Sequence, residues 1–362
     1  MAGGSIVLGK IFGIDIELHW SFVLILLIAA LYNLLVEIVI LFAMVVVHEL
    51  AHSVTSRRNG LNVKKILLLP FGGASIVELD NATPEVSFRV ALVGPLTSIL
   101  LGVVFGALAV YAPPGPLEQT FQWLFLLNML LGIFNLVPAF PLDGGRVLKS
   151  YLEKGMGKLE ATKIAVKVSE VALVLFIAAS VLYEFSLSPS QSGWIFTLGW
   201  DVILAIFIYG GAKAELESAY IVKYTENLRV RDAISRNFVM VRPTAPMRSV
   251  YSTLLRRGTH IVLFMRNGRV CMVNKLPSTY GSMPPDVLGR SVEGFGSDLP
   301  TVDYNSRLSR AIEKMRYEEA PIVAVLRAGK VAGVLLGDHV EAIIALHMPQ
   351  AIASRKAAAG AK

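Results

Sequence analysis

Apolar residues dominate the first 220 positions of the chain in runs long enough to cross a lipid bilayer. A helix needs about 20 such residues to span a hydrocarbon core of about 30 Å. The run from Ser21 to Val47 is almost entirely apolar, and the helical pattern continues to Arg57. As one helix it would be roughly 55 Å long, so we expect a turn at Tyr32 and Asn33. The pattern predicts six membrane-spanning helices: a short one from residue 21 to this turn, and then 34–56, 86–111, 120–137, 164–185 and 195–211.

Two stretches between the apolar runs have the pattern of β-strands. Residues 5–18 alternate apolar with small or polar residues, which predicts one or two short strands before the membrane. Residues 63–77 hold two apolar runs hinged at residues 70–73, and each is too short to cross a bilayer. They predict a hairpin or re-entrant loop that pairs with another strand or lines a protein cavity, because unpaired backbone cannot face lipid. An unpaired strand edge there would be able to accept an extended peptide.

The pattern changes near Lys223, where the chain becomes mixed in the manner of a globular domain. Residues 230–270 and 292–331 form a weak repeat of about sixty residues, each with a helical pattern followed by two strand-like runs. We therefore expect two α/β units after the membrane domain. The expected divisions are 1–220 for the membrane domain, 221–285 and 286–348 for the two units, and 349–362 for a disordered tail.

The composition supports a membrane protein with a soluble part. The chain is 54% hydrophobic and 17% charged, with a mean hydropathy of +0.59, which excludes an ordinary soluble protein. Cys271 is the only cysteine, so an intrachain disulfide is excluded and the soluble part does not require an oxidising compartment.

The basic residues predict the orientation in the membrane. Lysines and arginines follow the second, fourth and sixth predicted spans, whereas the loops YAPPGPLEQT and EFSLSPSQSGW contain none. Loops rich in these residues stay in the cytoplasm. We therefore expect a multi-pass protein of the cell membrane with both termini cytoplasmic. We attribute much of the formal charge of +7 to this topology, and we do not expect nucleic-acid binding.

The second predicted span contains the pentad HELAH, with His48, Glu49 and His52 inside an apolar run. Ionisable groups at membrane depth are costly and usually serve a function. Residues four apart lie on one face of a helix, so His48 and His52 can bind a common metal ion. Glu49 is then free to transfer protons.

A catalytic metal site with two histidines needs a third protein ligand and an open position. Asp143 is the candidate, because it follows the prolines that end the fourth predicted span and precedes two glycines that allow a tight backbone, in FNLVPAFPLDGGRVL. Asp143 is expected at the same cytoplasmic depth as HELAH, so its carboxylate would be well placed as a ligand. The alternative is that Asp143 caps a helix that begins near Arg146. The residues alone leave both readings open.

Together, HELAH and FNLVPAFPLDGG about ninety residues later resemble the site-2 protease family of intramembrane metalloproteases. The resemblance spans roughly residues 5–215 and includes HWSF, GGAS and GPLTS. It implies that His48, His52 and Asp143 bind zinc and that Glu49 is the general base. It further implies that Asn135 lies near the substrate carbonyl, with a helix-packing amide as the alternative. The chain departs from the family at Ser98, where asparagine is usual.

The C-terminal repeat resembles a tandem of cystathionine-beta-synthase-type (CBS) domains, which some site-2 proteases carry. The resemblance implies regulation by an adenine nucleotide. In GVLLGDH, however, Leu336 stands where the ribose-binding threonine is expected, and Asp338 is one position early. The alternative is a module for homodimerisation or gating.

These observations predict a zinc-dependent intramembrane endopeptidase that cuts the membrane-spanning segments of protein substrates within the lipid bilayer. Two alternatives remain. Two histidines and a carboxylate also form the metal site of non-haem iron enzymes, and a metal-binding transporter or sensor would use the same ligands.

Outside the pentad, Asp201 in the sixth predicted span is expected to form an interhelical hydrogen bond. Lys167 and Glu170 are expected to pair along the fifth.

Overall fold

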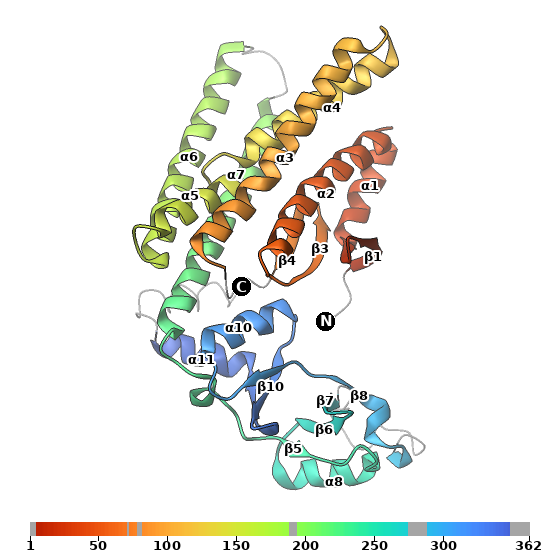
Figure 1. The fold of residues 1–362 in the computed structure, drawn as a ribbon, viewed down its shortest axis with the longest axis vertical. Helices are drawn as coiled ribbons and strands as arrows, with labels where there is room; N and C mark the ends of the chain where they lie inside the picture. The colour runs from red at the N-terminus through yellow and green to blue at the C-terminus, as the bar shows by residue number, and fades with distance from the viewer. Residues whose placement is uncertain (1–4, 71, 78–81, 188–193, 274–287, 348–362) are drawn as a thin grey trace. The chain divides into compact units, whose positions relative to one another are not determined.

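The computed structural model describes residues 5–70, 72–77, 82–187, 194–273 and 288–347. The chain divides into two compact units, Met1–Tyr220 and Ile221–Lys362. The first unit contains a small sheet and seven helices among its described residues, and the second contains two α/β halves (Figure 1). The expected boundary between residues 285 and 286 and the expected tail 349–362 lie outside the described residues.

Four strands form one sheet in the first unit, in the order β1-β2-β3-β4. The strands are β1 (Ser5–Ile11), β2 (Ile14–His19), β3 (Val63–Leu69) and β4 (Gly72–Val77). Both strand-like stretches of the sequence are confirmed as antiparallel hairpins, and β2 and β3 join them in parallel. Buried and half-buried residues alternate along β2, which places Ile14, Ile16 and Leu18 in a core with Phe42. Among the described strands, β4 forms one edge of the sheet.

The helices of the first unit follow the apolar runs. They are α1 (Trp20–Leu31), α2 (Leu35–Arg58), α3 (Pro84–Tyr111), α4 (Pro116–Asn135), α5 (Asp143–Glu153), α6 (Lys158–Leu187) and α7 (Trp194–Thr225). Among the described residues, α2, α3, α4 and α6 are long and apolar enough to cross a membrane, and α1 is a shorter apolar helix. The turn expected at Tyr32 and Asn33 is confirmed: Asn33 has a φ of 57°, a conformation that asparagine tolerates better than most residues.

Small residues bring α3 and α4 close together along their length (Figure 1). A Cβ atom on Gly132 would lie 2.6 Å from Cγ1 of Ile99 and 2.9 Å from the carbonyl oxygen of Pro95. Gly102 is likewise covered by Met129. Close approach through small residues is a common way for membrane helices to associate. This packing fixes α3, which borders the pentad of α2.

The second unit contains a strand–helix–strand–strand order twice, at the spacing seen in the sequence. Its first half contains β5 (Val239–Met240), α8 (Met247–Arg257), β6 (Val262–Arg266), β7 (Arg269–Val273) and β8 (Gly296–Asp298). Its second half contains β9 (Thr301–Asp303), α10 (Leu308–Tyr317), β10 (Ile322–Arg327), β11 (Lys330–Leu336) and α11 (Gly337–His347). In each half a short strand pairs in parallel with the first strand of a hairpin.

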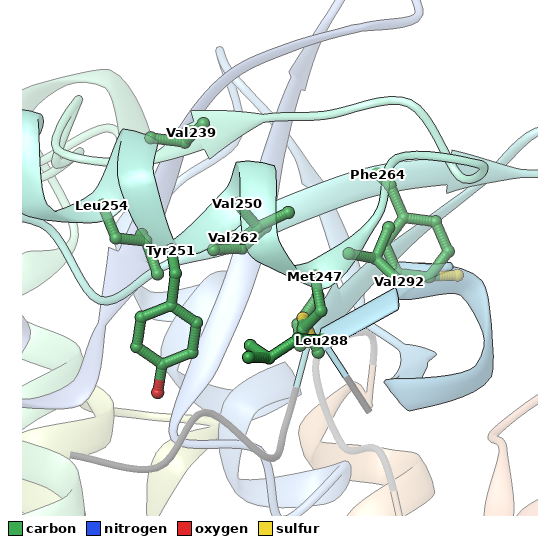
Figure 2. Packing of buried hydrophobic residues seen from close by; sticks show 11 residues of the cluster. Val239, Met247, Val250, Tyr251, Leu254, Val262, Phe264, Leu288 and Val292 are labelled. Atoms are coloured by element: carbon green, nitrogen blue, oxygen red, sulfur yellow. The ribbon is translucent and has the colours of Figure 1, made fainter. Parts of the chain in front are cut away.

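The first half buries the apolar face of α8 against its sheet, and the residues that α10 buries in the second half are Leu308, Ala311, Ile312 and Met315. Figure 2 shows Met247 and Val250 of α8 packed with Val262 and Phe264 of β6. A second cluster joins the halves, because Leu263 and its neighbours contact residues of the other hairpin. The unit is therefore one body with two related parts.

Candidate metal centre

The pentad lies on α2 with both imidazoles on one buried face, as the i, i+4 spacing predicts. The exposed fractions of His48 and His52 are 3% and 7%, and that of Asp143 at the start of α5 is 8%. Nε2 of His48 lies 3.1 Å from Nε2 of His52. Oδ2 of Asp143 lies 3.1 Å from the first nitrogen and 3.0 Å from the second. The structure thus brings together three predicted ligands from distant parts of the sequence.

This triangle has the dimensions of a zinc site. In a tetrahedral site with bonds of about 2.0–2.1 Å, neighbouring ligand atoms are about 3.3 Å apart. The three observed separations are close to that value. All three groups offer lone pairs to a metal, and such a buried arrangement of acceptors is stabilised by a cation at its centre. The donor set therefore fits zinc, with two nitrogens, one oxygen and a fourth position for water or substrate.

Helix α3 forms a wall behind the two histidines. Nδ1 of His48 lies 2.9 Å from Oγ of Ser98, and Nδ1 of His52 donates a hydrogen bond of 2.6 Å to the carbonyl oxygen of Val90. Gly94 lies between these two contacts. A Cβ atom there would be 2.1 Å from Nε2 of His52 and 2.8 Å from Nε2 of His48. The ring nitrogens that face away from the triangle are therefore both held by α3.

Asp143 reaches the triangle because the chain folds tightly between α4 and α5. Leu142 is the N-cap of α5 and Asp143 is its first helical residue. The alternative that Asp143 caps a helix beginning near Arg146 is therefore wrong, because the helix begins three residues earlier. A Cβ atom on Gly144 would lie 2.3 Å from the carbonyl oxygens of Leu136 and Val137. Only glycine permits this approach.

Two further helices hold the segment that precedes Asp143. The backbone N–H of Phe140 donates to Oγ of Ser169 on α6 at 2.9 Å, and both residues are buried. On α7, a Cβ atom on Gly211 would lie 2.7 Å from Cδ of Pro141. The position of Asp143 therefore depends on α6 and α7 as well as on α5.

Glu49 is held by β4. The hydroxyl of Ser75 donates to Oε2 of Glu49 at 2.7 Å, and Ser53 lies 3.0 Å from the same hydroxyl. Gly73 lies flat against the side chain of Glu49, since a Cβ atom there would be 2.4 Å from its Cγ. The hairpin predicted from residues 63–77 thus contacts the predicted general base directly.

Three other polar residues have defined partners. Asn135 is half-buried, and its Nδ2 donates to the carbonyl oxygen of Leu131 in its own helix at 2.8 Å. Asp201 accepts a hydrogen bond of 2.5 Å from Ser180, which confirms an interhelical bond between α6 and α7. Glu170 pairs with Lys213 of α7 at 3.2 Å. The expected pairing of Glu170 with Lys167 is wrong, because the carboxylate turns towards the neighbouring helix.

Sequence reasoning missed the supporting serines. Ser75 belongs to GGAS, Ser98 to GPLTS and Ser169 to an otherwise unremarked part of α6. The first two stretches belong to the family resemblance, but nothing in them says which ligand or base each hydroxyl contacts. Ser98 in particular keeps a polar contact to the site despite its departure from asparagine.

Comparison with known proteins connects this geometry to a family. The model of Peptidase family M50 matches residues 36–119 and 111–179. A zinc metalloprotease of Methanocaldococcus jannaschii is 32% identical over 278 residues, which cover 74% of this chain and 76% of the relative.

A site-2 protease from Methanocaldococcus jannaschii has a TM-score of 0.44 and 35% identity, and the match covers 59% of this chain and 95% of the other. The CBS domain of a bacterial CNNM/CorC family Mg2+ transporter, solved in complex with ATP, has a TM-score of 0.30 and 17% identity, over 37% of this chain and 99% of the other.

Proposed function

Because the chain belongs to Peptidase family M50, the site-2 protease family of membrane zinc metalloendopeptidases, we propose that it cleaves transmembrane segments of membrane proteins within the bilayer. The observation that carries this proposal is the buried triangle of His48, His52 and Asp143. Glu49, next to His48 in the sequence, is held separately by Ser75. A metal site with an adjacent, oriented carboxylate suits hydrolysis of a peptide bond.

In this proposal His48, His52 and Asp143 bind one zinc ion per chain. Bound zinc supplies a nucleophilic water at neutral pH and a Lewis acid for the scissile carbonyl. Glu49 accepts the proton of the attacking water and later delivers it to the leaving amine. The hydrogen bond from Ser75 to Oε2 orients the carboxylate and leaves Oε1 for the proton.

Asn135 is proposed to donate a hydrogen bond to the oxyanion that develops on the scissile carbonyl. Its Nδ2 donates one hydrogen to the carbonyl oxygen of Leu131 at 2.8 Å, and this role assigns the second amide hydrogen to the substrate. The edge of β4 is proposed to receive the substrate as an added strand, because it contacts Glu49 and is an edge among the described strands. Extended substrate backbone would then be presented next to the base.

We further propose six spans in the cell membrane, with both termini cytoplasmic and the metal site towards the cytoplasmic side. The C-terminal unit is proposed to be a CBS pair, with divisions at 221–285 and 286–348, that regulates cleavage. Its two related halves support this proposal. The proposed regulator is an adenine nucleotide, and the alternative is that the pair acts as a module for homodimerisation or gating.

Cleavage of a tagged single-span substrate in detergent tests the proposal. Wild type should cleave it, a zinc chelator should stop cleavage, and added zinc should restore it. Glu49→Gln should abolish cleavage and retain stoichiometric zinc, whereas His48→Ala should lose the zinc itself. Equal cleavage by wild type and Glu49→Gln would remove Glu49 as the base.

Metal analysis of the purified protein separates the proposal from the other metal functions. Stoichiometric iron with oxygen-dependent turnover would identify a non-haem iron enzyme instead. A metal transporter or sensor predicts that Glu49→Gln leaves metal transport or sensing intact and that no substrate is cut.

A further inference from the structure

The two histidines differ in what holds the nitrogen that faces away from the metal triangle. Nδ1 of His52 lies 2.6 Å from the carbonyl oxygen of Val90. A carbonyl oxygen only accepts hydrogen bonds, so Nδ1 of His52 carries the proton and Nε2 offers its lone pair to the triangle. The backbone of α3 therefore selects the metal-binding tautomer of His52.

The contact at His48 has a different chemistry. Nδ1 of His48 lies 2.9 Å from the hydroxyl oxygen of Ser98, and a hydroxyl can donate or accept. The competing tautomer of His48 carries its proton on Nε2, where it would donate to Oδ2 of Asp143 at 3.1 Å. That tautomer blocks the nitrogen that a metal needs. His48 is thus the ligand whose tautomer depends on a side chain.

Burial makes the partner of Nδ1 decisive. Ser98 is 1% exposed and His48 is 3% exposed, so bulk water does not reach this contact. A buried N–H without an acceptor is costly. Val90, Gly94 and Ser98 are spaced four residues apart on α3, so one face of the helix meets both imidazoles. The absence of a side chain at Gly94 lets that face approach closely enough for the hydroxyl to reach the ring.

We propose that Ser98 is a positioning residue for the metal site. Its Oγ accepts the Nδ1 proton of His48 and so keeps Nε2 of His48 unprotonated and directed at the metal. This inference rests on the proposed zinc site. Outer hydrogen bonds of this kind typically contribute 10–100-fold to metal affinity. Ser98 does not contact the substrate in this role and acts through His48.

The test measures the zinc dissociation constant of the full chain in detergent by competition with a chelator. Thr and Val have the same shape, and only Thr keeps the hydroxyl, so Ser98→Thr and Ser98→Val form a matched pair. We expect Ser98→Val and Ser98→Ala to bind zinc about 10–100-fold more weakly than wild type. Ser98→Thr should bind at least about tenfold more tightly than Ser98→Val. Cobalt absorption spectra should show the same order.

Thr97→Ala is the control on the same helix. The hydroxyl of Thr97 donates to the carbonyl oxygen of Val93 in its own helix at 2.8 Å, so its removal should leave zinc affinity unchanged. Equal affinities of Ser98→Thr and Ser98→Val, or of Ser98→Ala and wild type, would overturn the role of Ser98. Absence of zinc from wild type would overturn the proposed function instead, so the two failures are distinguishable.

Discussion

At Gly94, α3 lies so close to both imidazoles that no side chain fits between them. A Cβ atom at this position would lie 2.1 Å from Nε2 of His52, well inside van der Waals contact. The same is true at Gly73, where the neighbour is the side chain of Glu49. These two glycines let backbone lie against the ligands and the base. Both positions therefore require a residue without a side chain.

Gly94→Ala should therefore disrupt the metal centre. Either the imidazoles or α3 must move to admit the methyl group, and we expect at least about a 100-fold loss of zinc affinity with loss of cleavage. Zinc content and cleavage measure this. Gly199→Ala is the control, because a Cβ atom there meets nothing within 4 Å and alanine favours a helix. Full zinc content in Gly94→Ala would contradict the geometry described for α3.

At the residue scale, the sequence predicted the groups whose chemistry is unusual for their position. Two histidines and a glutamate in an apolar run stand out because such groups are costly in a membrane. Ser75 and Ser98 do not stand out, because a serine in a membrane helix or hairpin can bond to its own backbone. Their partners are decided by tertiary contacts that residue type does not reveal.

Among the elements, the segment between α4 and α5 depends most on its neighbours. It carries Asp143, yet Ser169 of α6 binds its backbone and Gly211 of α7 packs against Pro141. The sixth predicted span ended at residue 211, whereas α7 continues to Thr225. Hydropathy marks only the apolar part of a helix, so the polar extension beyond it was missed. Ion pairs such as Lys149 with Glu215, at 3.4 Å, belong to that extension.

Adjacent glycines of α7 provide a test of this dependence. Gly211→Ala should displace Pro141, because its Cβ atom would lie 2.7–2.8 Å from three ring atoms, and the aspartate that follows should move with it. We expect cleavage and zinc affinity to fall roughly 10–100-fold. Gly210→Ala, whose Cβ atom would meet nothing within 4 Å, should behave as wild type in both assays. Identical zinc affinity and cleavage in the two variants would show that the packing of α7 on Pro141 does not position Asp143.

Over the whole molecule, the net positive charge and the metal centre belong to different units. Residues 221–362 contain 21 lysines and arginines against 11 acidic residues, whereas residues 1–220 contain 13 against 16. The excess positive charge therefore belongs to the C-terminal unit, which corrects its attribution to membrane topology. The basic residues of the membrane loops do not produce a net positive charge, because the carboxylates of the same unit offset them. The repeat in this unit was visible in the sequence, but the joint core of its halves depends on three-dimensional packing.

The stability of the C-terminal unit should depend on pH through Asp298 of β8. Arg269 and Arg266 at the β6–β7 turn bond to its carboxylate at 3.0 and 2.9 Å, and with Cys271 they lower its pKa to about 2. The unfolded value is about 3.9. This contribution is therefore fully present above about pH 4 and is lost as the pH falls towards 2.

Cys271 reports on this pairing, because it is the only cysteine of the chain and is buried. Arg269→Gln removes one ion pair of Asp298 and keeps the contact of Asp298 with Cys271 at 3.4 Å. It should raise the rate at which Cys271 reacts with a pyridyl disulfide roughly twofold to fivefold at pH 6, and the difference from wild type should disappear by pH 2. Glu341→Gln, an exposed change on α11, should leave the rate unaltered. A ratio of rates that stays constant with pH would show that the ion pairs of Asp298 do not stabilise the unit.

The order of strands in the first unit has a consequence for biosynthesis. β2 and β3 are parallel neighbours, but α1 and α2 lie between them in the chain. The sheet can close only after both helices and the strands up to residue 77 have been synthesised. Asp143 follows later still, after α3 and α4. A nascent chain therefore carries HELAH with an incomplete ligand set, and the metal centre can assemble only once the chain beyond α4 has been made.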